Sequence, residues 1–366
     1  MKPSICIVTC YRQPDYVRAA ALRQGLRASG VFREVIVVKN RRTNAGRYLE
    51  VIMALLKVRL RQNPDAYMLT FRGYEMLPIV LLLGLGKKVV YDELINPVEW
   101  FVYEHRWFRE GSLAARLLRA MYGWLGRRTS AIIADTPSHA AYSAELLGLP
   151  QGKYWTIPVS TDETLFNKLT HQPHDGFRVL YYGSMLPLHG VDYVIEAALE
   201  LADRPDITFH IIGGKAALAG RVQRAIERGA RITYDSWIPY EQLPVVMAGS
   251  DLCLGGPFGD TVQAQFVVTG KTYQFLAAGL PVVVGANRES DGFIDKQTAL
   301  VVPLADTRAL VGAIRWAEAH PQELRHMAAN GRELYEAQYS SARVAEELRR
   351  LFADHVFQVQ AGRDDE

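Results

Sequence analysis

Runs of β-branched and aromatic residues alternate with helical patterns along the whole chain, and this alternation restricts the possible fold more than any other feature. The runs lie at 4–10, 34–40, 66–71, 87–93, 130–136, 154–159, 177–183, 207–214, 230–237, 250–256, 280–286 and 299–304. Such runs are typical of strands buried on both faces, and strands separated by helices form parallel sheets. We therefore predict an α/β protein with two Rossmann-like, doubly wound domains facing each other across a cleft.

The length of 366 residues also favours two domains, because it exceeds what one typical hydrophobic core supports. The polar stretch 167–176 marks the boundary between the two series of strands. We predict one domain at 1–166 and a second at 167–340. The remaining segment, 341–366, is expected to form a helix that crosses back to the first domain and to end in a disordered tail, AGRDDE.

The cysteines and the apolar segments indicate where the protein works. Cys6, Cys10 and Cys253 have neither the number for a disulfide framework nor metal-ligand spacing, so they are interpreted as buried thiols of a reducing compartment. The N-terminus enters a strand without the pattern of a secretory signal. The longest apolar run, 76–86, has about half of the roughly 20 residues that a membrane span needs. We expect a cytoplasmic protein in which this run is a buried helix.

The charges are distributed unevenly. Residues 1–165 contain 23 Lys and Arg against 14 Asp and Glu, a net of +9, whereas 166–366 contain 19 against 25, a net of −6. A basic half favours an anionic partner, such as a membrane surface, a lipid phosphate or a nucleic acid, and the alternative is solvated surface arginine. The segment 105–128 has the pattern of a basic amphipathic helix. It could lie on an anionic membrane or pack on the sheet.

Candidate ligand-binding residues follow the strands of the second half. Ligands of such sheets bind beyond the carboxyl ends of the strands, where glycine lets a backbone approach closely. These positions hold Gly183, Ser184, Gly213, Gly214, Trp237, Ile238 and the loop 255–261. The run GKTYQFLAAGLPVVVG at 270–285 then places Lys271 and Gln274 at a helix start, where free N–H groups and the dipole favour a phosphate. Tight turns, core packing of Trp237 and a solvated lysine are the alternatives.

Several of these segments resemble, in the right order, the retaining glycosyltransferases of group 1, which have the GT-B fold. The resemblance lies in VLYYGSMLPLHGVDYVIEAALEL at 179–201, ITFHIIGG, ITYDSWIPYEQLPVVMAGSDLCLGG and GKTYQFLAAGLPVVVG, with IPVSTDETLF at 157–166 similar to the interdomain segment. Ordered, spaced matches are more specific than one motif. The resemblance covers nearly the whole chain and implies that the second domain binds a nucleotide-diphosphate sugar, with a UDP-sugar as the assumed donor, and the first binds the acceptor.

The chain departs from the family pattern at the donor phosphates. The family commonly has an Arg and a Lys where this chain has Ser184 and His189, so Lys271 becomes the main expected cation. The family also often has two glutamates eight residues apart, and here Phe266 and Gln274 take their places. Gln274 can still bind ribose hydroxyls. We expect Gly259, Asp260 and Thr261 to contact the transferred sugar, unless their loop is only an insertion.

The resemblance implies a transfer with retention of configuration, through an oxocarbenium-like state. No Asp-x-Asp motif occurs, so no metal or other cofactor is expected. In the first domain Asp92, Glu93 and His105 are the catalytic candidates, and Arg72, Arg106 and Thr136 the candidates on the acceptor side. Glu104, His105 and Arg106 could equally be surface residues, and Thr136 an N-cap.

The expected function is transfer of a sugar to a glycan or glycolipid acceptor in cell-envelope polysaccharide biosynthesis. No nucleic-acid partner is expected, and a lipid acceptor would bring the protein to the inner face of the membrane. A sugar-nucleotide epimerase or a phosphorylase of the same fold is an alternative from another reaction class. A non-catalytic relative that binds nucleotide-sugars is a third, because the acidic pair is missing. A nicotinamide enzyme is least favoured, since no G-x-G-x-x-G follows the first strand.

Overall fold

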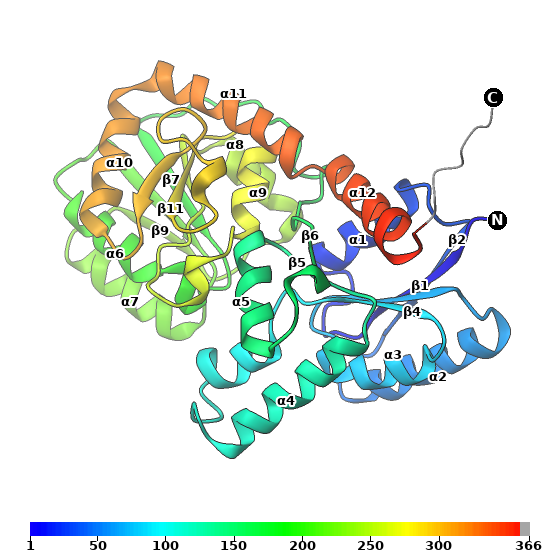
Figure 1. Cartoon of the computed structure of the whole chain (residues 1–366). Helices are drawn as coiled ribbons and strands as arrows, with labels where there is room; N and C mark the ends of the chain where they lie inside the picture. The colour runs from blue at the N-terminus through cyan, green and yellow to red at the C-terminus, as the bar shows by residue number, and fades with distance from the viewer. Residues whose placement is uncertain (359–366) are drawn as a thin grey trace, which may run out of the picture. The chain divides into compact units, whose positions relative to one another are not determined.

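The computed structural model describes residues 1–358 of the chain, which form two compact units (Figure 1). The first unit contains Met1–Val159 and residues 341–358, and the second contains Ser160–Ser340. Residues 160–166, which the sequence placed with the first domain, lie in the second because Phe166 is fully buried there, with its ring 5.3 Å from that of Tyr240. The predicted disordered tail lies outside the described residues.

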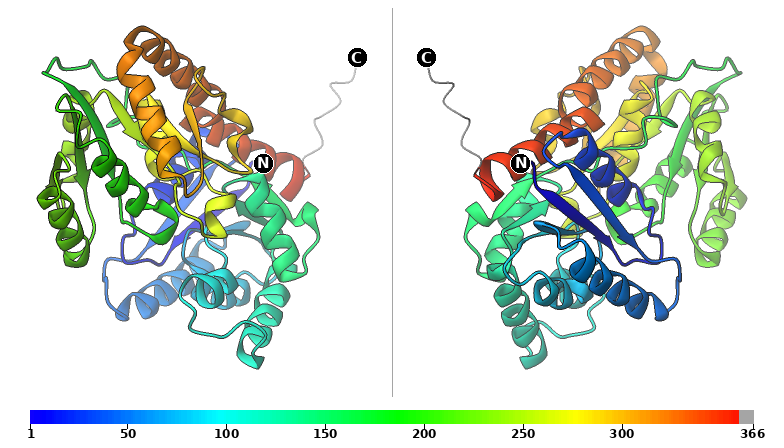
Figure 2. Two further views of the ribbon diagram at one scale, coloured as in Figure 1. Left: turned by 90° about the vertical axis from the view of Figure 1, so that its left-hand side faces the viewer. Right: turned by 90° about the vertical axis from the view of Figure 1, so that its right-hand side faces the viewer.

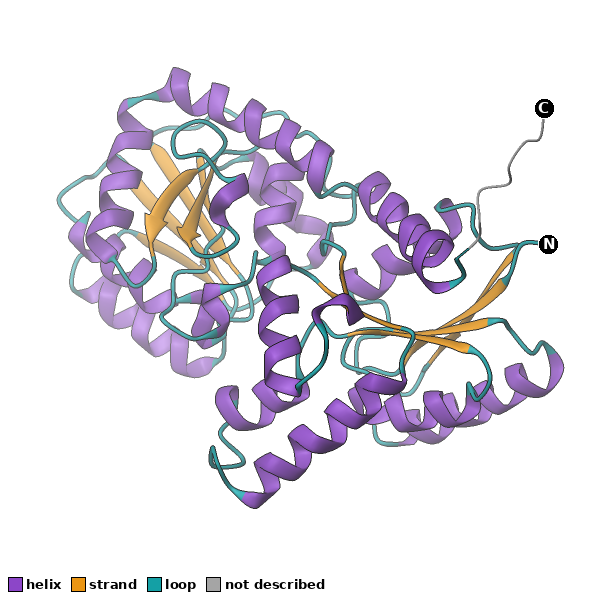
Figure 3. Cartoon of the chain, in the orientation of Figure 1, coloured by secondary structure: helices purple, strands orange, loops and turns teal. Residues whose placement is uncertain are grey.

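The first unit is built on a parallel sheet with the strand order β2-β1-β3-β4-β5-β6. Its strands are β1 (Ser4–Thr9), β2 (Glu34–Lys39), β3 (Ala66–Leu69), β4 (Lys88–Asp92), β5 (Ala131–Ala134) and β6 (Tyr154–Thr156). The helices are α1 (Val17–Ala28), α2 (Gly46–Arg61), α3 (Leu77–Leu83), α4 (Leu113–Arg128) and α5 (Pro137–Leu147). Figure 3 shows them against the sheet. All six predicted strands of this half are confirmed.

The C-terminal segment completes the core of the first unit. Helix α12 (Ser341–Arg350) and the π-helical turn η8 (Leu351–Val356) lie beside α1, as Figures 1 and 2 show. Leu348 and Phe352 are fully buried in one apolar cluster with Leu22 and Leu26 of α1. Gly25 allows this close approach, because a Cβ there would lie 2.7 Å from the Leu348 side chain. The chain therefore returns to its first unit after building the second.

The second unit repeats the architecture with the strand order β12-β11-β10-β7-β8-β9, again parallel. The strands are β7 (Phe177–Tyr182), β8 (Ile207–Ile212), β9 (Ile232–Asp235), β10 (Leu252–Leu254), β11 (Val282–Ala286) and β12 (Leu300–Pro303). The helices are α6 (Val191–Glu200), α7 (Ala216–Glu227), α8 (Leu243–Ala248), α9 (Gly270–Ala277), α10 (Thr307–Ala319) and α11 (Pro321–Gln338). The predicted strands of this half are confirmed too.

Each sheet has one point where the chain reverses the direction in which it adds strands. In the first sheet this point lies between β1 and β3, and in the second between β7 and β10. At such a switch point the connections leave on opposite faces and open a crevice at the carboxyl ends of the strands. The residues that follow β1, β3, β7 and β10 therefore line the edges where a ligand is expected to bind.

Two predicted helices differ from the expectation. The run 76–86 forms helix α3 over Leu77–Leu83, but the prediction that it is buried holds for one face only: Leu77 and Val80 are buried, whereas Leu82 is 61% exposed. The predicted helix 105–128 begins only at Leu113, because the Ser112 side chain caps the helix by accepting a hydrogen bond from Ala115 N. Glu99–Glu104 instead form a separate π-helical turn, η2. Among residues 1–358, no helix is both long and apolar enough to cross a bilayer.

Candidate functional site

Lys271 stands at the start of α9, close to the switch point of the second sheet. Its side chain is buried, and burial lowers the pKa of its ammonium group from the ordinary 10.5 to about 7. The Nζ atom lies 5.2 Å from the centroid of the Tyr181 ring, and no carboxylate within residues 1–358 forms an ion pair with it. A buried cation without a counter-ion is costly in a free protein. Its place is explained if an anionic ligand supplies the missing charge.

Gly183 and His189 lie beside Lys271. A Cβ on Gly183 would be 3.5 Å from His189 Nδ1 and 3.9 Å from Lys271 Nζ, so the three predicted residues meet at one point. His189 is held there by its carbonyl oxygen, which accepts a hydrogen bond of 2.9 Å from the Tyr181 hydroxyl. Burial, together with the Lys271 charge, lowers the pKa of His189 well below its usual value. The imidazole is therefore neutral, and its buried Nδ1 forms no hydrogen bond within the described chain.

The glycines of the site allow the backbone segments to touch. Gly213 follows β8 with φ of 110°, and a Cβ there would lie 2.1 Å from the carbonyl oxygen of Gly183. Gly214 has φ of 94°, with a Cβ position 2.4 Å from Leu218. Gly259 packs against the turn η4 (Pro187–His189), where a Cβ would lie 2.3 Å from the carbonyl oxygen of Pro187. Only glycine fits these contacts, which bring three loops to the carboxyl edge of the sheet.

Gln274 is less available than the sequence indicates. Its Oε1 accepts a hydrogen bond from the buried Tyr182 hydroxyl, and its Nε2 donates to the Tyr240 hydroxyl at 2.9 Å. A ribose would have to share or replace these partners. The sequence did not single out either tyrosine, and nothing local in it indicates the pairing, because the tyrosines lie 92 and 34 residues away.

The other candidates of the second unit lie nearer the surface. Ser184 and Asp260 are exposed, and Ile238 is half-buried. Thr261 accepts a hydrogen bond from Ala264 N and so caps the short turn η6 (Gln263–Gln265). Trp237 is 74% exposed, so the alternative that it packs in the core is wrong. An exposed indole is suited to stacking on a base.

In the first unit, Arg72 follows β3 at the switch point. Its backbone has φ of 51°, and its guanidinium lies over the rings of Trp100 and Tyr11, at 4.1 and 5.5 Å from their centroids. His105 is exposed and packs edge-on against the same Trp100, with ring centroids 4.1 Å apart. Arg106 is exposed next to it. The structure thus brings Arg72 and His105 together on one tryptophan.

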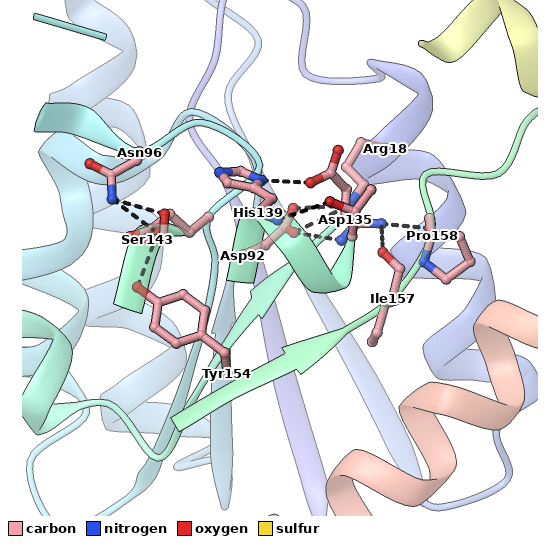
Figure 4. Close-up of polar contacts among 11 residues, drawn as sticks. Arg18, Asp92, Asn96, Asp135, His139, Ser143, Tyr154, Ile157 and Pro158 are labelled. Carbon is pink, nitrogen blue, oxygen red and sulfur yellow. Dashed lines mark hydrogen bonds and ion pairs between the residues drawn. The ribbon is translucent and has the colours of Figure 1, made fainter. Parts of the chain in front are cut away.

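Asp92 has a structural environment instead. Its carboxylate is fully buried and accepts hydrogen bonds from Arg18 Nη2 at 2.9 Å and Phe71 N at 3.1 Å (Figure 4). Burial raises the pKa of Asp92, while the Arg18 charge opposes the rise. Arg18 also donates to the carbonyl oxygens of Ile157 and Pro158, at 2.8 and 2.6 Å. These hydrogen bonds hold the sheet to the chain that leaves β6, and they account for the burial of Asp92 without a catalytic role.

Glu93 and Thr136 also have local partners. Glu93 accepts hydrogen bonds from Tyr154 Oη at 3.2 Å and Asn96 Nδ2 at 3.3 Å, and burial raises its pKa. Thr136 is the N-cap of α5, since its hydroxyl accepts from His139 N at 3.1 Å. The N-cap alternative for Thr136 is therefore confirmed, which leaves its predicted acceptor role without support from the contacts.

A buried titratable group near these residues was missed by the sequence reasoning. His139 Nδ1 lies 2.6 Å from the Asp135 carboxylate (Figure 4). Burial opposes a charge on His139, but Asp135, Glu99 and Glu93 together raise its pKa to about 9. Burial also raises the pKa of Glu99 to about 7. The spacing of Asp135 and His139 across a helix start was the available signal.

Comparisons with known proteins agree with this geometry. Residues 194–350 match the family model described as "Glycosyl transferase-like". No curated protein sequence matches the chain significantly.

Solved structures match almost the whole chain. HepE from Anabaena, in complex with UDP and glucose, is 13% identical, with 96% of this chain and 100% of that chain covered and a TM-score of 0.70. Sucrose-phosphate synthase from Thermosynechococcus elongatus is 17% identical, with 96% and 98% covered and a TM-score of 0.72. A glycosyltransferase from Rickettsia africae is 12% identical, with 98% and 99% covered and a TM-score of 0.70. The predicted two-domain GT-B fold and the resemblance to group 1 glycosyltransferases are thus confirmed.

Proposed function

We propose that the protein is a retaining glycosyltransferase that takes a sugar from a UDP-sugar and transfers it, without a metal ion, to a glycan or lipid-linked acceptor. One observation carries the proposal: the buried Lys271, which has no ion-pair partner in the part of the chain that the structure describes, lies beside His189 and Gly183 at the switch point of the second sheet. The family match and the UDP complexes of HepE support it, because they connect this fold with nucleotide-sugars.

The donor site acts through charge and fit. The departing diphosphate gains negative charge as the glycosidic bond breaks, and Lys271 would neutralise it from the start of α9. His189, being neutral, would add one hydrogen bond rather than a second charge. Gly183 and Gly213 would let the phosphates reach the backbone. Lys271, His189 and the free N–H groups of the helix start can together do without a divalent ion.

We assign the acceptor to the first unit, where Arg72 and His105 contact Trp100. Arg72 would orient an acceptor oxygen, and His105 would take or relay a proton. Glu93 remains a predicted catalytic residue, with Arg106 a predicted acceptor contact.

The acceptor is proposed to be at an anionic membrane on its cytoplasmic face. Helix α4 buries one side, and on the other it exposes large apolar residues at helical spacing, Leu113, Leu117, Met121 and Trp124. Exposed arginines flank this stripe, among them Arg128, whose guanidinium lies 3.5 Å from the Trp124 ring. An apolar stripe with cationic flanks is suited to a bilayer surface with anionic lipids.

The test is to incubate the purified protein with a panel of nucleotide-sugars in the presence of a chelator, with and without lipid and glycan acceptors. We expect release of UDP and a product whose anomeric configuration, read by proton NMR, matches the donor. Complete loss of turnover that Mg²⁺ or Mn²⁺ restores would contradict the metal-free mechanism. UDP binding without transfer or hydrolysis would favour the non-catalytic alternative, and net conversion of the nucleotide-sugar would favour the epimerase.

A further inference from the structure

Two histidines and one aspartate meet outside the donor site, where the segment 167–176 passes the start of β10. His171 Nε2 lies 3.1 Å from one carboxylate oxygen of Asp251, and His174 Nε2 lies 3.3 Å from the other. The three ligand atoms all lie within 4.8 Å of one another. We propose that these side chains bind a divalent transition metal ion, Zn²⁺ or one with similar preferences, which fastens this segment to the second sheet.

The donor set fits such an ion by type and distance. Two imidazoles and a carboxylate suit zinc and its neighbours, whereas magnesium and calcium prefer oxygen ligands. Ligands about 2.1 Å from a tetrahedral zinc are about 3.4 Å from each other. The two observed nitrogen–oxygen separations, one to each carboxylate oxygen of Asp251, are close to this value, and the two histidine nitrogens lie within 4.8 Å of each other. His171 is the most exposed of the three, at 46% of its side chain, so it can adjust and leave a position for solvent.

The hydrogen bonding of His174 argues for a cation between the rings and the carboxylate. His174 Nδ1 lies 3.2 Å from the carbonyl oxygen of Asp175, which can only accept, so this nitrogen carries a proton. In a neutral ring Nε2 then has a lone pair, and that lone pair faces a carboxylate oxygen. The His174 side chain is only 6% exposed, so bulk water cannot separate the two. The lone pair of His174 Nε2 and the negative carboxylate oxygen repel each other. A metal ion between them would remove this repulsion, and so would a second proton on His174.

The carboxylate is fixed by the sheet. Asp251 Oδ2 accepts a hydrogen bond of 2.8 Å from Arg178 N at the start of β7, and Asp251 N donates to Arg178 O at 2.9 Å. The Asp175 carbonyl oxygen, which lies near His174 Nδ1, and the Arg178 N–H, which donates to Asp251, are outer partners of the kind that orient metal ligands. The segment itself is tied at Gln172 N, which donates to Ala248 O at 2.7 Å. A metal ion bound by His174, two residues after Gln172, would attach this segment to the second sheet at another point.

The experiment uses the full chain without a histidine tag and Zn²⁺ alone as the probe. Isothermal titration and thermal unfolding should show one bound ion per chain and a higher melting temperature with zinc. His174→Ala and His171→Ala should each weaken binding at least about tenfold, the effect seen when ligand geometry is lost. His210→Ala is the matched control, because His210 pairs with Asp235 at 2.8 Å without a second histidine, and it should bind zinc like the wild type.

Two results would overturn the proposal: no zinc binding by the wild-type chain, or equal binding by the variant that lacks both histidines. Either would leave the cluster as a histidine–aspartate ion pair with a second proton on His174. His171 is exposed, so its variant remains informative even if His174→Ala unfolds. The site is independent of the proposed sugar transfer: a chelator should lower the melting temperature of the wild type but not abolish its transfer activity.

Discussion

Binding of UDP should be coupled to uptake of a proton by Lys271. Burial lowers the Lys271 pKa from 10.5 to about 7 in the free protein, and a diphosphate beside the ammonium group should restore the ordinary value. At pH 8 the free lysine is then roughly one-tenth protonated, so binding takes up roughly 0.9 proton per site, against roughly 0.1 at pH 6. This prediction rests on the proposed donor site.

Calorimetry in buffers of different ionisation enthalpy measures this number directly, since the apparent binding enthalpy changes with the buffer in proportion to the protons taken up. Lys271→Met should abolish the uptake and weaken UDP binding by about 1.5–3 kcal/mol while leaving uridine binding nearly unchanged. His189→Asn is the control for the other titratable group of the site and should keep the uptake. Uptake near zero in the wild type at pH 8, or uptake that survives in Lys271→Met, would refute the assigned role.

The same pKa has a consequence for the free protein. Because the folded-state pKa lies below the unfolded value, the unfolded chain binds more protons between pH 7 and 10.5, and stability rises with pH through this range. The difference between the two pKa values corresponds to about 5 kcal/mol of unfolding free energy, which the protein lacks at a pH where Lys271 is charged in the folded state. Lys271→Met should therefore raise the free energy of unfolding at pH 6, as measured by urea denaturation, by up to this amount.

Three further predictions concern other parts of the molecule. The folded-state pKa of His139 is about 9 against 6.5, so its contribution of about 3 kcal/mol should be present below pH 6.5 and lost as the pH rises to 9; urea denaturation of His139→Asn should lack this slope. Replacing Leu117 and Trp124 by serine should reduce sedimentation with anionic vesicles at low salt, and unchanged binding would make α4 an ordinary surface helix. Gly213→Ala should lower the unfolding free energy by about 2 kcal/mol or more, whereas Gly220→Ala, in the open middle of α7, should raise it by about 0.5–1 kcal/mol.

Most of the strands could be predicted from the sequence because they are buried on both faces and so form continuous apolar runs, whereas the partly exposed edge strands β2 and β9 were predicted from their β-branched and aromatic residues. The first and last residues of the strands could not be predicted in this way. The run 250–256 forms a strand only at Leu252–Leu254, because its pairing with β7 and β11 extends over so few residues. Residues 105–112 continue the helical pattern of 113–128 but lie before the Ser112 cap, so pattern alone placed the helix start too early.

The donor site was predictable in part for a similar reason. Gly183 directly follows β7 and Lys271 lies at the start of α9, the helix between β10 and β11, and the topology of a doubly wound sheet brings such positions to one edge. The partners of the predicted side chains were not predictable, because they come from distant positions. Arg18 lies 74 residues from Asp92, and Tyr182 lies 92 residues from Gln274. No local pattern in the sequence distinguishes a paired group from an unpaired one at that separation.

The distinction between a paired and an unpaired group decides the roles of two deeply buried charges in the predicted site. Asp92 is the last residue of β4, Lys271 is the second residue of α9, and both side chains are almost completely buried. Arg18 and Phe71 satisfy the carboxylate of Asp92, so its burial is compensated within the protein and no ligand is needed. Lys271 forms no ion pair within the described chain, and its neighbours are the Tyr181 ring and the neutral His189 imidazole, so burial lowers its pKa. An uncompensated buried charge destabilises the free protein, and this cost is offset when a ligand brings the opposite charge. The two histidine–aspartate sites differ in the same way. In the His210–Asp235 pair one ring is matched by one carboxylate, whereas in the His171–His174–Asp251 cluster two rings share one carboxylate.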